Sequence, residues 1–208
     1  GAKLDEFDGM VKLTKEAPLI VIEGDEYLAS AIDQRPKFHL YKPHVALISG
    51  VAWDHANVFP TFETYVNQFR LFIKTIEPKG TLVYNKEDRT LTELVLEDRS
   101  KINKHGYRTP EYTINKGVTY MHTHQGDIPL QVFGKHNLSN IAAAFTVCDW
   151  LGVERDSFYE AIKQFRGASR RLEYVASDDE SVVYQDFAHT PTKLKASIQA
   201  LKEQFPDK

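Results

Sequence analysis

One strand–helix–strand pattern in the first half of the chain limits the possible fold more than any other feature. The apolar run VALISG at 45–50 ends in glycine, as buried parallel strands commonly do. The segment at 61–76 carries large apolar residues at helical spacing, with Thr61 as the expected N-cap. TLVYN at 81–85 is typical of the next strand. The chain is therefore predicted to be α/β, with a mostly parallel doubly wound sheet.

The remaining patterns predict additions to this sheet. LIVIEG at 19–24 is expected to be another buried strand. Residues 105–133 alternate apolar and polar side chains around turn signals, which predicts an additional antiparallel β-hairpin region. Two helices follow, with Gly152 ending the first and Asp156 capping the second. A strand and a helix at 181–205 then resemble the first βα unit of a second α/β domain.

Length and composition exclude several classes of protein. The 208 residues hold 26 basic and 29 acidic side chains, and the formal charge of −3 is too small to indicate a nucleic-acid or membrane surface. No apolar run is long enough for a transmembrane helix, and the single Cys148, which cannot form an internal disulfide, fits a cytoplasmic protein. We predict a partial central domain over 1–167 and the start of a C-terminal domain over 168–208. Because the chain begins with Gly1 rather than Met, we expect a processed chain or a start inside a longer protein.

Acidic and imidazole side chains follow two of the predicted parallel strands. Glu23, Asp25 and Glu26 end the first apolar run, and Asp54 and His55 follow the second. Ligands of doubly wound sheets bind at the carboxyl ends of the strands, so these groups are expected at one edge. Mg²⁺ takes one or two carboxylates together with phosphate oxygens and water. The residues alone leave a metal site and a solvated acidic turn equally open.

A third segment carries groups suited to a nucleobase. GKHNLSNIAAAF at 134–145 begins a helix of small residues, and backbone N–H groups at a helix start can meet a nucleotide. Asn137 and Asn140 lie three residues apart and therefore share a helical face. An asparagine amide both donates and accepts, which suits an adenine edge. Asn137 could also cap the helix.

Two later segments carry groups suited to phosphate and ribose. Arg170 and Arg171 in SRRLE could clamp a phosphate or form surface ion pairs. Asp186 and His189 in QDFAHTP follow a predicted strand, where a carboxylate can accept from ribose hydroxyls.

In this order, these motifs resemble those of the Mur ligase family, the ATP-dependent amide ligases that build the peptidoglycan stem peptide. The resemblance covers nearly the whole chain, through VIEGDEYLAS, ISGVAWDHANVFPTFETYVNQF, GKHNLSNIAAA, RRLE and DFAHTPTKL. It implies that Glu23 and His55 bind a metal ion, Mg²⁺. It also implies ATP contacts from a second set, which comprises His136, Asn137 and Asn140 at adenine, Arg171 near the phosphates, and Asp186 with His189 at ribose.

The resemblance implies an ADP-forming ligation through an acyl phosphate. UDP-N-acetylmuramate would be joined to the tripeptide L-alanyl-γ-D-glutamyl-meso-diaminopimelate in peptidoglycan recycling. The DEYLAS and RPKF segments favour this tripeptide over L-alanine as the incoming amine, and a degenerate, non-catalytic nucleotide-binding domain is a further alternative. The expected partners are these small molecules, with no nucleic acid and no membrane.

The chain also departs from the family pattern. No Gly-rich phosphate loop with a lysine occurs in the 208 residues, so no catalytic set is complete and the chain alone is expected to be inactive. The sequence assigns no role to Asp25, Glu26, Arg35 or Lys37, and it indicates no oligomeric state.

Overall fold

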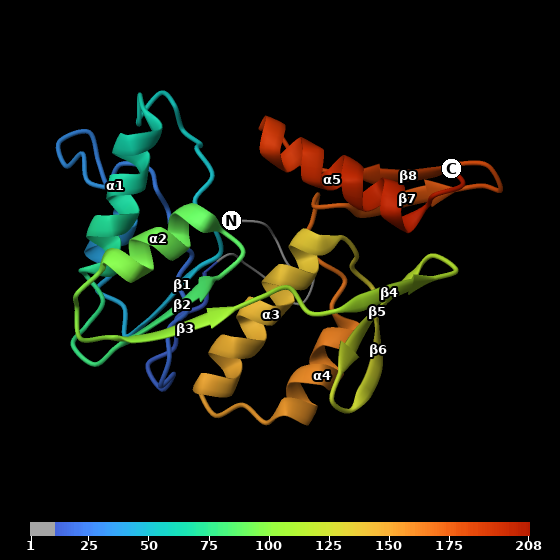
Figure 1. The fold of residues 1–208 in the computed structure, drawn as a ribbon, viewed down its shortest axis with the longest axis horizontal. Coiled ribbons are helices and arrows are strands. Elements are labelled where there is room, and N and C mark those ends of the chain that lie inside the picture. Colours follow the sequence, from blue (N-terminus) through green and yellow to red (C-terminus); the bar gives the residue numbers. More distant parts are fainter. Residues whose placement is uncertain (1–10) are drawn as a thin grey trace. The chain divides into compact units, whose positions relative to one another are not determined.

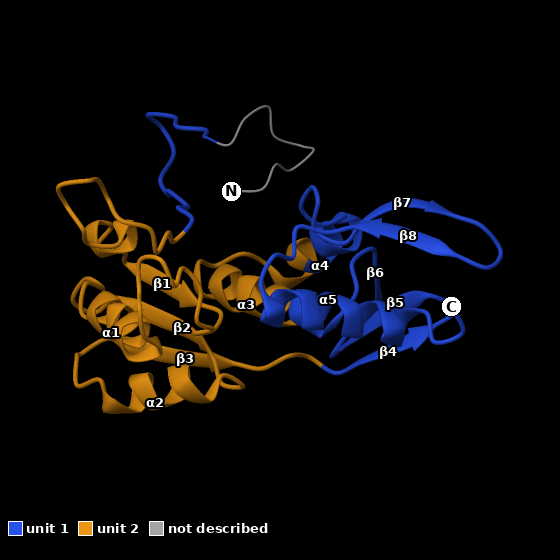
Figure 2. Cartoon of the chain, turned by 90° about the horizontal axis from the view of Figure 1, so that it is seen from above, with its two compact units in different colours: residues 1–23, 111–137, 159–208 blue, residues 24–110, 138–158 orange. Residues whose placement is uncertain are grey.

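The computed structural model describes residues 11–208, so Gly1 and the rest of the first ten residues of the predicted central domain lie outside the described part. The chain divides into two compact units (Figure 2). Unit 1 comprises residues 1–23, 111–137 and 159–208, and unit 2 comprises residues 24–110 and 138–158. The domain boundary proposed between 167 and 168 stays a prediction.

Unit 2 is built on a three-stranded parallel sheet in the order β1–β2–β3 (Figure 1). The strands are β1 (Val45–Ile48), β2 (Thr81–Asn85) and β3 (Asn103–Tyr107). Helix α1 (Phe62–Ile73) connects the first pair, and α2 (Arg89–Glu97) connects the second pair. The predicted strand–helix–strand unit and the α/β class are confirmed, whereas α2 was not predicted.

The alternation of side chains along β2 explains how both faces of the sheet are covered. Leu82 is buried in the cluster that includes residues of α1 and α2. Its neighbour Val83 is buried with Tyr107 and with Ala143 of α3 (Lys135–Trp150). Because successive strand residues point to opposite faces, α1 and α2 cover one face and α3 covers the other. This is the doubly wound arrangement that the sequence predicts.

Local signals set the ends of several helices. Thr61 caps α1, as predicted, because its side chain accepts from the backbone N–H of Thr64 at 3.2 Å. Gly152, with φ 81°, follows the end of α3, also as predicted. Asp156 does not cap α4 (Arg155–Gln164) but is its second residue, where a carboxylate favours the positive end of the helix dipole.

Two predicted strand assignments are wrong. Residues 19–22 form no strand and are exposed, with Val21 at 93%. A strand needs a neighbour to pair its backbone groups, and no described strand pairs with this run. Residues 105–107 belong to parallel β3 rather than to a hairpin, because they pair with Val83 to Asn85 of β2.

Unit 1 holds the predicted antiparallel region as a three-stranded meander. Its strands are β4 (Tyr112–Asn115), β5 (Val118–Thr123) and β6 (Gly126–Leu130). The later part of the unit forms β7 (Glu173–Ser177), β8 (Val182–Gln185) and α5 (Pro191–Gln204). Thr190 caps α5, which was not predicted, and Pro191 is the first residue of this helix. The pairing of β7 with β8 was not predicted.

A buried polar contact joins α5 to the meander within unit 1. Gln204 is 4% exposed and Thr119 is 1% exposed. The Gln204 Oε1 atom accepts from Thr119 Oγ1 at 2.8 Å, and its Nε2 atom donates to the Gly117 carbonyl at 2.6 Å. Buried polar groups are costly without partners, so this contact fixes how α5 packs on β5.

Replacement of Gln204 by alanine is expected to lower the free energy of unfolding by about 2 kcal/mol, because Thr119 and the Gly117 carbonyl lose their buried partner. Urea denaturation measures the change. Gln199→Ala on an exposed part of the same helix is the control, and equal stability of the two variants would contradict the assigned contact.

Among residues 11–208, none of the helices is long and apolar enough to cross a membrane.

Candidate functional site

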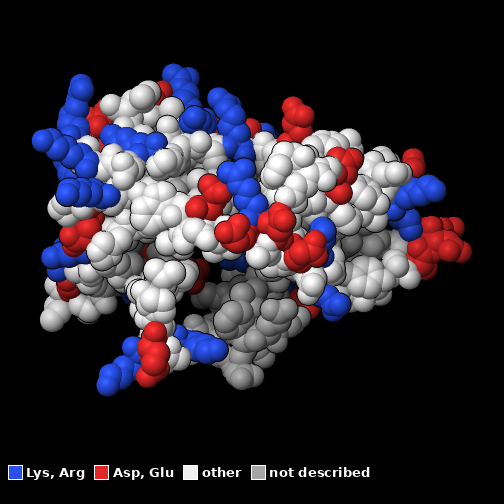
Figure 3. All heavy atoms as spheres, turned by 90° about the horizontal axis from the view of Figure 1, so that it is seen from below, with Lys and Arg blue, Asp and Glu red and all other residues white. Residues whose placement is uncertain are grey.

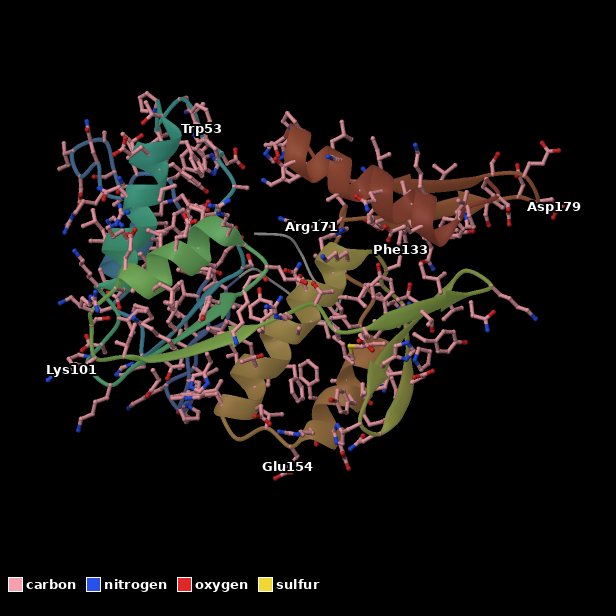
Figure 4. All side chains as sticks on the ribbon, in the orientation of Figure 1. Trp53, Lys101, Phe133, Glu154, Arg171 and Asp179 are labelled. Atoms are coloured by element: carbon pink, nitrogen blue, oxygen red, sulfur yellow. The ribbon has the colours of Figure 1, made fainter. Side chains whose placement is uncertain are left out.

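His55 lies in a turn whose backbone is left-handed. Its φ is 56°, a conformation that non-glycine residues rarely adopt and that is found often at functional sites. Asp54 Oδ1 accepts from the His55 N–H at 2.8 Å, and the His55 carbonyl accepts from Val58 and Phe59. The indole N–H of Trp53 (Figure 4) donates to the Phe59 carbonyl at 3.0 Å. The turn is therefore held at several points and presents the imidazole in a defined position.

Two carboxylates and the Tyr27 ring lie beside this imidazole in unit 2. His55 Nε2 lies 3.9 Å from Glu26 Oε2, and His55 Nδ1 lies 3.9 Å from Asp54 Oδ1. The Tyr27 ring is centred 4.3 Å from the His55 ring. Tyr65 donates to Glu26 Oε1 at 3.3 Å, and burial together with this carboxylate raises the pKa of the Tyr65 phenol. Glu26, to which the sequence assigned no role, is thus fixed beside His55.

The predicted metal pair falls in different units, since Glu23 belongs to unit 1 and His55 to unit 2. The pair therefore stays a prediction. Within residues 11–208, no group of three or more His, Cys, Asp or Glu side chains could hold a metal ion. The oxygen donors near His55 suit a hard cation such as Mg²⁺ only if phosphate oxygens and water complete its coordination.

The other unassigned charges near this site form structural pairs. Asp25 Oδ2 pairs with Lys37 Nζ at 2.7 Å, and Asp33 accepts from Arg35 at 2.9 and 2.7 Å. Burial raises the pKa of Asp25, but the bond from Lys37 and the bond from the Tyr27 N–H together outweigh it, so the net pKa lies below its usual value. These pairs stabilise the loop that carries Glu26.

The loop that leads from β1 to His55 is held by the residues after β2. Asp88 Oδ2 accepts from the Val51 N–H at 2.6 Å, while Asp88 Oδ1 accepts from Leu91 at 2.9 Å and caps α2. Asn85 donates to the Ser49 carbonyl at 3.2 Å. One strand end therefore positions the loop that follows its neighbour.

Unit 1 brings together three of the predicted nucleotide-binding residues. Burial lowers the pKa of the His136 imidazole; the Asp186 carboxylate opposes this shift, and the Arg171 guanidinium adds to it. Both charged groups therefore act on the same imidazole. Figure 4 marks Arg171 on the segment between α4 and β7. The result is a half-buried imidazole whose lowered pKa favours the neutral form.

Asp186 and His189 share the turn between β8 and α5. Asp186 Oδ1 accepts from the backbone N–H groups of Leu172 at 3.3 Å and Phe187 at 2.9 Å, and Oδ2 accepts from Ser197. His189 Nδ1 lies 2.9 Å from the Phe187 carbonyl and donates to it in the matching tautomer. The carboxylate is thus oriented before any ligand arrives. Nothing in the sequence pattern pointed to Ser197.

Asn137 and Asn140 both belong to the first part of α3. Asn137 does not cap the helix, which begins at Lys135; its amide donates to the Phe133 carbonyl at 2.8 Å. Asn140 is exposed. Their shared helical face agrees with the expected spacing, and their role at adenine stays a prediction.

Comparison with known proteins indicates the family to which this chain belongs. Residues 9–148 match the Mur ligase middle domain. The UDP-N-acetylmuramate--L-alanine ligase of Aquifex aeolicus (strain VF5) is 31% identical over 100% of this chain and 46% of its own length. The UDP-N-acetylmuramate--L-alanyl-gamma-D-glutamyl-meso-2,6-diaminoheptandioate ligase of Haemophilus influenzae (strain ATCC 51907 / DSM 11121 / KW20 / Rd) is 27% identical, over 90% of this chain and 43% of its own. The chain thus spans less than half the length of either relative.

Solved structures share the fold. MurF from Acinetobacter baumannii has a TM-score of 0.68 and 21% identity, covering 80% of this chain and 39% of its own. The UDP-N-acetylmuramate:L-alanyl-gamma-D-glutamyl-meso-diaminopimelate ligase (MPL) from Neisseria meningitides has a TM-score of 0.59 and 24% identity, covering 71% and 48%. Since the middle-domain match extends over more than half of the residues, the chain belongs to the Mur ligase family.

Proposed function

We propose that this chain is part of an ATP-dependent, ADP-forming ligase that joins the carboxylate of UDP-N-acetylmuramate to an amine. In this proposal the chain contributes the residues that contact adenosine, and Arg171, which contacts the phosphates of ATP. It also contributes the metal ligands Glu23 and His55. The observation that carries the proposal is the position of Asp186, whose Oδ1 atom accepts from the Leu172 N–H, next to Arg171, at 3.3 Å. Both charged groups also act on the His136 imidazole. Figure 3 shows both basic and acidic side chains on the face that it draws, and the formal charge of −3 suits small-molecule substrates better than a nucleic acid.

The reaction has two steps in this proposal. A substrate carboxylate oxygen attacks the γ-phosphorus of ATP, the bond to the β-phosphate oxygen breaks, and ADP leaves. The amine nitrogen then attacks the acyl carbon, phosphate leaves, and the nitrogen loses a proton. A bound Mg²⁺ would supply charge neutralisation where the two anions meet. Arg171 would bind phosphate oxygens, and Asp186 would orient ribose.

The preferred incoming amine is the tripeptide L-alanyl-γ-D-glutamyl-meso-diaminopimelate, which the DEYLAS and RPKF segments favour. This assignment describes a murein tripeptide ligase. L-alanine is the second candidate, and the 31% identity to the Aquifex aeolicus L-alanine ligase supports it. An assay of the whole protein with ATP, UDP-N-acetylmuramate and each amine separates the two. ADP formation that requires the tripeptide supports the first, and ADP formation that requires L-alanine supports the second.

This chain alone is expected to release no phosphate from ATP, because its 208 residues contain no Gly-rich phosphate loop. A coupled phosphate assay with UDP-N-acetylmuramate and either amine measures this directly. Phosphate release above the buffer rate, abolished by Asp186→Ala, would contradict the expectation.

A further inference from the structure

The segment that carries Arg171 has an unusual backbone. Arg170 has φ 59° and Leu172 has φ 47°, so a left-handed residue lies on each side of Arg171. Neither residue is glycine, and each left-handed non-glycine residue costs on the order of 1 kcal/mol or more. Such a turn persists only if its surroundings hold it in place.

Two carboxylates hold this turn. Glu173 Oε2 accepts from the Arg170 N–H at 2.6 Å, and Asp186 Oδ1 accepts from the Leu172 N–H at 3.3 Å. Glu173 lies opposite Gln185 in the β7–β8 pair, so the two carboxylates come from facing strand ends. The Arg171 N–H itself donates to the Ala168 carbonyl at 3.0 Å. Every backbone N–H from 170 to 172 is therefore engaged.

Of the two carboxylates, only Asp186 has a place in the proposed nucleotide site. Glu173 is the last residue of the SRRLE segment, and no function has been assigned to it. Its side chain is exposed, so its carboxylate is not needed to fill the core. Its bond to a strained residue next to Arg171 gives it a specific task.

We propose that Glu173 is a positioning residue for Arg171. It holds Arg170 in the left-handed conformation and, with Asp186 on the other side, fixes the direction in which the Arg171 guanidinium leaves the backbone. The proposal rests on the proposed function, in which Arg171 binds a nucleotide phosphate.

The test uses this chain and two readouts, amide hydrogen exchange at Arg170 and Leu172 and an NMR titration with ADP. Glu173→Ala is expected to accelerate exchange of both amides roughly tenfold and to weaken ADP binding severalfold. Glu173→Gln keeps a carbonyl oxygen as acceptor and is expected to restore most of both properties.

A glycine rescue separates backbone positioning from a charge effect. Glycine adopts positive φ without steric cost, so Arg170→Gly added to Glu173→Ala is expected to return ADP affinity to within about threefold of the original. Arg166→Gly in the same background removes the same charge at a residue without positive φ, and it is expected to restore nothing. Equal rescue by both glycines, or unchanged Leu172 exchange in Glu173→Ala, would overturn the proposal. If the unaltered chain binds no ADP, the proposed phosphate role of Arg171 fails, while the exchange pattern still decides whether Glu173 sets the turn.

Discussion

Replacement of Asp88 by alanine is expected to lower the free energy of unfolding by about 3 kcal/mol. One carboxylate caps α2 through Leu91 and also accepts from the Val51 N–H at 2.6 Å. Loss of an N-cap costs about 1 kcal/mol, and loss of a charged acceptor for a second N–H costs about 2 kcal/mol more. Chemical denaturation of the variant measures the total.

The same substitution is expected to disturb His55. The loop from Val51 to His55 begins at the bond to Asp88, so the His55 ring signals should broaden or shift in the NMR spectrum of Asp88→Ala. Asp88→Asn keeps one acceptor oxygen and should lose less stability. Asp179→Ala, at the exposed β7–β8 turn marked in Figure 4, should change stability by less than about 0.5 kcal/mol. A loss for Asp88→Ala no larger than that of Asp179→Ala would contradict the double role.

Replacement of Lys104 by methionine is expected to cost about 3 kcal/mol, because it leaves the Asp98 carboxylate, 7% exposed, without its cation. Lys104 Nζ lies 2.9 Å from Asp98 Oδ2 and donates to the carbonyls of Val95 and Asp98 at the end of α2. Thermal or urea unfolding measures the loss. Lys101→Met, an exposed lysine nearby in sequence, is the control and should be nearly neutral.

The cost of Lys104→Met should depend on pH. Burial raises the pKa of Asp98, but bonds from Ser100 and Lys104 outweigh it, so the net pKa in the folded protein is lowered. A lowered carboxyl pKa contributes stability that is present above the ordinary value of about 4 and is lost as the pH falls through the folded-state pKa. The difference between the original chain and the variant should therefore shrink below about pH 4. A difference that stays constant between pH 7 and pH 3 would contradict the ion pair.

The sequence predicted the elements whose signals are local. Thr61 and Gly152 mark helix ends through backbone chemistry that acts within a few residues, and both behave as expected. The strand predicted at 19–22 is wrong, because an apolar strand depends on a pairing partner elsewhere in the chain. Helix α2 was missed, although Asp88 caps it.

The same distinction applies to the candidate sites: contacts within one motif could be predicted from the sequence, and contacts between distant segments could not. Residues within one motif, such as Asp186 and His189, are placed together by chain connectivity alone. Glu26 could not be assigned from the sequence, because its role depends on Tyr65, which is 39 residues away, and on the turn at His55. Ser197 likewise meets Asp186 only because α5 folds back beside the end of β8.

The most direct test of the central claim is an NMR titration of the isotope-labelled chain with adenosine and with ADP. If unit 1 carries the adenosine and phosphate contacts, adenosine should shift His136 and the amides beside Asp186. ADP should shift these and also Arg171, with dissociation constants weaker than about 1 mM because no phosphate loop assists. Both responses should disappear in Asp186→Ala. Shifts confined to other residues, or no shift at about 10 mM ADP, equivalent to less than about 3 kcal/mol of binding, would contradict the account.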